Sequence, residues 1–127
     1  MRRDYRLYLD DILDAIHQIR SYVEGQDEET FSADRKTQDA VIRNLEIIGE
    51  AAGNLPAENK EIAREVDWRK ITGLRNILIH EYFGINLPIV WDVVQNKLTP
   101  LETACRRLLD IAADPADRTA ESQSGDQ

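Results

Sequence analysis

The chain has 127 residues, enough for one domain that buries roughly two-thirds of its unfolded surface around a single core. Its one cysteine, Cys105, excludes an internal disulfide and any zinc site built from several cysteines, and we expect it to be a buried thiol. The formal net charge of −8 argues against long tracking along duplex DNA, which depends on neutralising phosphates. No apolar run suits a signal peptide or a membrane span, so we expect a soluble, cytoplasmic protein.

Apolar residues spaced by threes and fours predict helices through most of the chain. The first helix is expected from about Tyr5 to Val23, and the polar stretch from Gly25 to Thr30 follows it as a connection. Ser32 is expected to cap the N-terminus of a second helix, which should end near Gly53.

Three further helices are expected in the second half of the chain. A short one falls at 58–65, and Asp67 is expected to cap the next, which the pattern ends near Gly84. The apolar pattern then resumes from 87 to 112 and keeps its phase across Pro100, which predicts a kink there rather than a helix end.

No segment shows the period-two alternation of a strand, so the predicted fold is all-α, an antiparallel bundle of four to five helices. We expect the helical domain to cover residues 1–113. Residues 114–127 are small, polar and acidic, too poor in apolar surface to offset the entropy of ordering, and are predicted to form a disordered acidic tail. The tail carries a net charge of −3, which leaves −5 on the domain.

The stretch from Arg75 to Tyr82 holds a cation, an imidazole and a phenol among largely apolar residues. Arginine can hold a phosphate with two donors, and histidine exchanges a proton near neutrality, so Arg75 and His80 could bind or cleave a phosphodiester without a metal. On an ideal helix the two are about 140° apart. Either the helix loosens near His80, or a second subunit completes the site.

Purely structural roles are the alternative for these residues. Arg75 could pair with an acid of the second helix such as Glu46, which could also pair with Arg43. His80 would then be an ordinary histidine at a helix end, and Tyr82 would be an aromatic residue of the core.

We expect no metal site and no cofactor. His17 lacks companion ligands at helical spacing and is predicted to lie at the surface. Asp10, Asp11 and Asp14 could bind a divalent ion together, but a solvated acidic face is the favoured interpretation.

The pattern Arg75-x-x-x-x-His80-x-Tyr82, with Gly73-Leu74 before it and Phe83-Gly84 after it, resembles the signature of the HEPN superfamily. More narrowly, it resembles the HepT toxins of prokaryotic HEPN/minimal-nucleotidyltransferase toxin–antitoxin modules. The segment from Arg43 to Pro56 also resembles the second helix of that family, and the likeness spans roughly residues 5–112. It implies a HEPN-like homodimer whose two motifs line one interfacial cleft.

The resemblance also implies an activity, a metal-independent endoribonuclease that acts as a toxin. His80 would be the general acid or base, Arg75 would stabilise charge on the phosphate, and Asn76 would orient His80 or bind phosphate. RNA would be the substrate, and a 2′,3′-cyclic phosphate would be left. The cognate minimal nucleotidyltransferase antitoxin would transfer AMP to Tyr82 and so silence the nuclease.

A competing hypothesis is a non-catalytic nucleotide-binding or scaffold subunit of a nucleotidyltransferase complex. In that case Arg75 and Asn76 would grip a nucleotide while the partner enzyme does the chemistry. The charge of −8 fits a partner with a basic surface at least as well as it fits RNA.

Overall fold

The computed structural model describes residues 3–80 and 86–113, with side chains described for 3–74 and 86–113. The predicted tail at 114–127 lies outside these residues. Every regular element in the described part of the chain is a helix, which confirms the all-α prediction. The elements are α1 Tyr5–Val23, α2 Glu28–Ser32, α3 Arg35–Asn54, α4 Ala57–Ile62, α5 Trp68–His80, α6 Leu87–Asp92, the π-helical turn η2 Val93–Lys97, and α7 Leu98–Ala112.

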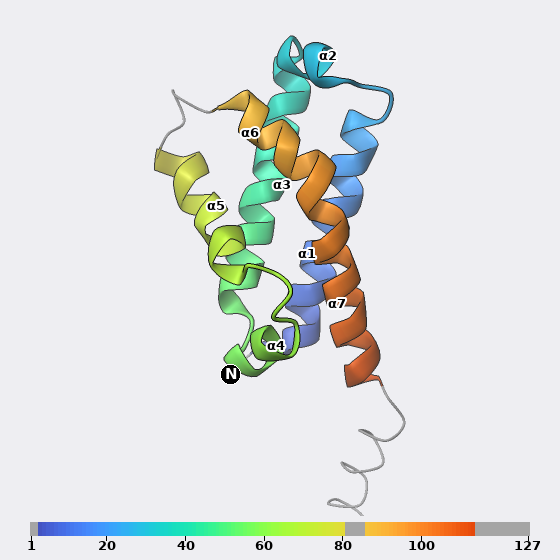
Figure 1. Cartoon of the computed structure of the whole chain (residues 1–127), viewed down its shortest axis with the longest axis vertical. Coiled ribbons are helices and arrows are strands. Elements are labelled where there is room, and N and C mark those ends of the chain that lie inside the picture. Colours follow the sequence, from blue (N-terminus) through green and yellow to red (C-terminus); the bar gives the residue numbers. More distant parts are fainter. Residues whose placement is uncertain (1–2, 81–85, 114–127) are drawn as a thin grey trace, which may run out of the picture.

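The long helices lie side by side and alternate in direction (Figure 1). Both α3 and α7 pack against α1, and α5 packs on α3. None of the described helices is both long and apolar enough to cross a lipid bilayer.

The core lies where α1, α3 and α7 meet. Cys105 is fully buried there, as expected, and burial raises the pKa of its thiol to about 12. The largest fully buried side chains are those the sequence pattern marks, with Phe31 in addition: Leu9, Ile12, Ile16, Ile19, Val41, Leu45, Ile48, Leu98, Leu101 and Leu108.

The prediction that Ser32 caps the second helix is wrong. Ser32 is the last residue of the short helix α2, and the carboxylate of Asp34 caps α3 by accepting from the Thr37 N–H at 3.1 Å. The extra helical turn buries Phe31 completely, and the Gln38 side chain donates to the Phe31 carbonyl. An aspartate two residues further on, together with a buried ring, therefore decides where α3 begins.

The helix that contains Pro100, α7, continues past this proline, as predicted. The departure from α-helical geometry lies one turn before Pro100, in the π-helical turn η2 that joins α6 to α7. Proline has no N–H, so in a regular α-helix the carbonyl of Asn96 would lose its partner at Pro100. The π-turn just before it shifts the hydrogen-bond register by one residue. Figure 1 shows α6 inclined to the direction of α7 around this turn.

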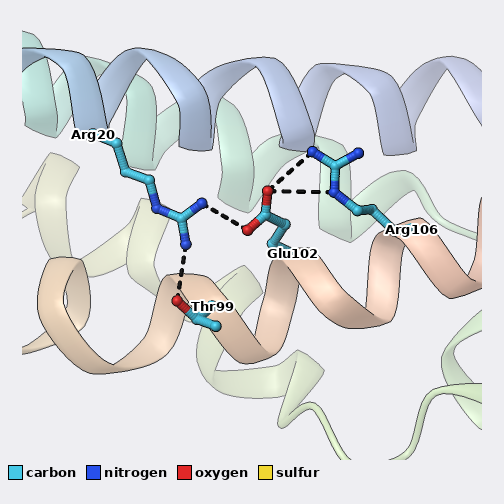
Figure 2. A network of polar contacts seen from close by, with 4 residues as sticks. All are labelled: Arg20, Thr99, Glu102 and Arg106. Carbon is cyan, nitrogen blue, oxygen red and sulfur yellow. Dashed lines mark hydrogen bonds and ion pairs between the residues drawn. The ribbon is translucent and has the colours of Figure 1, made fainter.

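Arg20 of α1 and Glu102 of α7 join these two helices (Figure 2). The Arg20 Nη1 to Glu102 Oε1 distance is 2.6 Å, and Arg20 also donates to the Thr99 hydroxyl at 2.9 Å. Arg106 donates to the other oxygen of Glu102 at 3.1 Å. Hydrogen bonds from Arg20, and then from Arg106, hold the pKa of the Glu102 carboxyl below its ordinary value of 4.5.

The Glu102→Gln variant should therefore be less stable at neutral pH, by about 1 kcal/mol, because a neutral amide loses the charge interaction with two arginines. A lowered folded-state pKa means that the carboxylate stabilises the fold above its unfolded-state pKa and stops doing so as pH falls through the folded-state value. Urea unfolding at about pH 7 and about pH 3 should show the difference from the parent protein shrink at the lower pH.

The control for this variant is Asp39→Asn, which removes the exposed Arg35–Asp39 pair at 3.8 Å and should leave stability nearly unchanged. An equal loss for Glu102→Gln at both pH values would contradict the electrostatic account.

The start of α5 is fixed by two neighbouring residues. Trp68 is buried, and its indole N–H donates to the Ala63 carbonyl at 2.9 Å. Asp67 accepts from the Lys70 N–H at 3.3 Å, as the predicted cap should. The beginning of α5, the helix that contains Arg75 and His80, is thus tied to the loop after α4.

Replacing Trp68 by Phe should lower the free energy of unfolding by about 2 kcal/mol, because it removes buried volume and leaves the Ala63 carbonyl unpaired. Trp91→Phe is the matched control. Trp91 is half-buried, packs on Phe31 with ring centroids 5.1 Å apart, and its indole makes no hydrogen bond to the described part of the chain. Chemical denaturation that finds equal losses in the two variants would show that the Trp68 hydrogen bond does not matter.

Candidate functional site

Helix α5 carries the motif. It runs without a break from Trp68 to His80, so Arg75, Asn76 and His80 lie on one continuous α-helix. Their side chains, and the whole of Tyr82, lie outside the described residues. Because the backbone stays α-helical as far as His80, the separation of about 140° between Arg75 and His80 applies to this helix. The helix therefore does not loosen between Arg75 and His80.

Gly53 and Thr72 mark a point where α3 and α5 lie next to each other. A β-carbon placed at Gly53 would lie 3.5 Å from the Thr72 methyl group, an ordinary contact, so this line of α3 faces α5. Figure 1 shows the two helices running in opposite directions. Each helix rises about 1.5 Å per residue. Position 46 of α3, seven residues before Gly53, is therefore level with position 79 of α5, seven residues after Thr72.

This register brings Glu46 to the level of the end of α5. Glu46 lies seven residues before Gly53, which returns it to nearly the same face of α3, about 20° away. Its level corresponds to position 79, one residue from His80. Glu46 is half-buried, as expected of a residue on the packed side of α3.

The alternative partners predicted for Glu46 fit this geometry less well. No ion pair joins Glu46 to Arg43, although both side chains are described. The same register places Arg75 level with Glu50, which is exposed. Of the motif residues, His80 is the one whose level along the bundle matches Glu46.

A groove of about 810 Å³ opens between α5 and the continuous helix formed by α6, η2 and α7. Its described α5 wall includes Leu74, the residue that precedes Arg75 in the sequence. Arg69 and Lys70, which the sequence places near the motif, line one side, and Lys97 of η2 lines the other. Sequence reasoning misses Lys97, because no local pattern connects a residue of the last helix to α5.

The other sequence candidates stand apart from this helix. His17 is exposed, as predicted. In the acidic cluster of α1, Asp11 accepts from Arg3 at 2.7 Å. Within the side chains of residues 3–74 and 86–113, no three histidine, cysteine or acidic groups come together to hold a metal ion.

Comparison with known proteins gives concordant matches. The family model described as ribonuclease HepT-like matches residues 12–108. A "Probable ribonuclease HepT" of Thermococcus cleftensis is 40% identical over 108 residues, which cover 85% of this chain and 98% of that protein. A "Putative RNase MJ0127" of Methanocaldococcus jannaschii is 44% identical over 97 residues, which cover 76% of this chain and 80% of that protein.

A third relative shows how the domain occurs in a longer chain. The "Gamma-glutamylcyclotransferase and putative RNase MJ0434" of M. jannaschii is 38% identical over 110 residues, which are 87% of this chain but only 50% of that protein. The present chain thus spans about half the length of that relative. No solved structure matches the chain.

The family model covers most of the helical bundle, including α5 with Arg75 and His80, and the relatives match over most of their own length in two of the three cases. This chain belongs to the HepT-like ribonuclease family.

Proposed function

We propose that the protein is a metal-independent endoribonuclease and the toxin of a toxin–antitoxin system, with Arg75 and His80 as its catalytic residues. The observation that carries this proposal is the continuous helix α5, which presents both residues inside the region matched by the family model. The ribonuclease names of the relatives support the substrate class.

The proposed reaction transfers the phosphorus from the 5′-oxygen to the 2′-oxygen of the preceding ribose. The 2′-hydroxyl gives up its proton as its oxygen bonds to phosphorus, the bond to the 5′-oxygen breaks, and the leaving oxygen is protonated. His80 serves as general acid or base for one of these transfers. Arg75 stabilises the charge on the non-bridging oxygens, and Asn76, one turn before His80, binds phosphate or orients the ring. The products are a 2′,3′-cyclic phosphate and a 5′-hydroxyl, and DNA is not cut because it lacks the 2′-hydroxyl.

A homodimer resolves the geometry of these two groups. On one α5 helix, the backbone positions of Arg75 and His80 are about 140° apart around the axis, an arrangement unsuited to holding one phosphorus atom between them. In a symmetric dimer with paired α5 helices, a phosphate in the cleft between them meets an arginine of one protomer and the histidine of its partner. Dimerisation is then required for catalysis.

Glu46 is proposed as a positioning residue for His80. It lies on the line of α3 that faces α5, level with the end of that helix, and is half-buried. A carboxylate beside an imidazole fixes its tautomer and stabilises the protonated form, which would favour proton transfer near neutral pH.

Purified protein should cleave single-stranded RNA in the presence of EDTA. His80→Ala should reduce the rate by about 100-fold or more, since general acid–base catalysis contributes typically about 10²–10⁴-fold. Arg75→Ala should cost about as much through lost charge stabilisation. The matched controls, the exposed His17→Ala and Arg43→Ala, should keep parental rates.

The products, resolved by denaturing electrophoresis, should carry cyclic phosphate ends. Undiminished cleavage by either motif variant would overturn the assignment, as would complete inhibition by EDTA.

The proposed partner is a minimal nucleotidyltransferase antitoxin that transfers AMP from ATP to the Tyr82 hydroxyl, with release of pyrophosphate. Tyr82 is two residues from His80 in the sequence. A nucleotide attached there adds negative charge and bulk where the substrate phosphate must sit, which explains inhibition.

Co-expression with a cognate minimal nucleotidyltransferase should therefore raise the intact mass by whole AMP groups and abolish RNA cleavage. Tyr82→Phe should show no such increase and should stay active. Tyr22→Phe, which removes an exposed tyrosine of α1, should be modified like the parent protein. A mass increase that persists in Tyr82→Phe would contradict the assignment of the acceptor.

The chain's charge of −8 also favours a second candidate, a non-catalytic nucleotide-binding or scaffold subunit of a nucleotidyltransferase complex. Expression of the chain alone separates the two. The nuclease arrests growth in a manner that depends on His80, whereas a scaffold subunit has no such effect.

A further inference from the structure

The groove beside α5 has uncommitted positive charge on both of its walls. Arg69 on α5 and Lys97 on η2 are exposed. The side chain of neither residue forms an ion pair or a hydrogen bond with any other described residue. Both line the same groove, so the two cations flank one space.

The acids that line the groove already have partners. Glu65 forms an ion pair with Arg107 at 2.5 Å, and Asp92 accepts from the Asn96 amide at 2.6 Å. Asp67 caps α5 through the Lys70 N–H. Arg107 balances the charge of Glu65, and the Lys70 ammonium, 4.0 Å away, balances that of Asp67, whereas Asp92 keeps its charge. Against that one carboxylate stand the unpaired Arg69 and Lys97, which leave the described lining of the groove with one net positive charge for an anion.

Apolar side chains from both walls also line the groove. Ile71 and Leu74 come from α5, and Val93 and Leu101 come from η2 and α7. A volume of about 810 Å³ falls within the range of sites for small ligands, roughly 300–1,000 Å³. A flat apolar base can lie on such a surface while its phosphate contacts the cations at the edges.

The groove lies directly beside the motif. Arg69 precedes Arg75 by six residues, which corresponds to about 9 Å along α5. The two positions are also about 120° apart around the helix, so a strand whose scissile phosphate is held at Arg75 passes part of the way around α5, over about two nucleotides, to reach Arg69. The π-turn that carries Lys97 is a distortion often found at functional sites.

We propose that the groove between α5 and η2 binds a nucleotide of single-stranded RNA next to the cleaved position. Its phosphate lies between Arg69 and Lys97, and its base lies on Ile71, Leu74 and Val93. This subsite rests on the proposed ribonuclease function, and it explains how a chain with a charge of −8 holds RNA. The other candidate occupant is a second copy of the chain, since Ile89 at the edge is 57% exposed. RNA is favoured because a second copy would bring its own unpaired Arg69 and Lys97 to the same symmetric contact.

The test measures RNA binding in full-length protein carrying His80→Ala, so that the ligand stays intact. A fluorescein-labelled single-stranded RNA of about ten nucleotides is titrated by anisotropy at several salt concentrations. Arg69→Gln and Lys97→Gln should each weaken binding about 5-fold or more and lower the slope of log affinity against log salt by about 0.7, the value for one lost phosphate contact on a single strand. Lys36→Gln, which removes an exposed lysine that does not line the groove, should change neither.

A second variant, Ile89→Ser, identifies the occupant. Weaker RNA binding at an unchanged molar mass by light scattering supports the subsite. A halved molar mass would instead make the groove a contact between copies and overturn the proposal.

If Arg69→Gln and Lys97→Gln bind RNA like the parent protein, while the unsubstituted chain still cleaves RNA, the subsite is wrong and the proposed function stands. If the unsubstituted chain neither binds nor cleaves RNA, the proposed function itself fails.

Discussion

The antiparallel packing of α5 on α3 determines where every candidate catalytic group of this protein lies. The closeness of Gly53 to the Thr72 methyl group marks the register of the pair, and the buried Trp68 ties the first turn of α5 to the Ala63 carbonyl. From these anchors, the regular rise of two helices carries Glu46 to the level of His80. A shift of α5 by one turn would separate them, so the proposed catalytic geometry depends on packing that lies two turns away.

The continuity of α5 has a second consequence. A continuous helix sets the positions of Arg75 and His80 about 140° apart around its axis, which makes a complete site within one chain unfavourable. In the proposed dimer, symmetry supplies the missing group. The groove along the first half of α5 then gives the RNA strand a place to continue, because Glu65 and Asp67 are paired with Arg107 and Lys70 while Arg69 and Lys97 have no ion-pair partner among the described residues.

Most of the fold could be predicted from the sequence, because the apolar spacing of each long helix records which face is buried. The bounds Tyr5–Val23 follow from that spacing alone, whereas the predicted end of the next-to-last long helix near Gly84 lies outside the described residues. What the sequence does not show depends on distant neighbours. Phe31 is buried by packing outside its own short helix, which is why α2 and the cap at Asp34 were missed. The level of Glu46 relative to His80, and the place of Lys97 across the groove, follow only once helices far apart in the chain are packed together.

The central claim is that one phosphate is cleaved by Arg75 of one subunit and His80 of the other. The most direct measurement mixes the two inactive variants, Arg75→Ala and His80→Ala, exchanges their subunits by mild denaturation and refolding, and assays RNA cleavage. A mixed dimer would contain one site with both substitutions and one site with neither. The account therefore predicts that activity reappears in the mixture although each variant alone is inactive. If verified mixed dimers stay inactive, each site takes both residues from a single chain, and the shared-site account is contradicted.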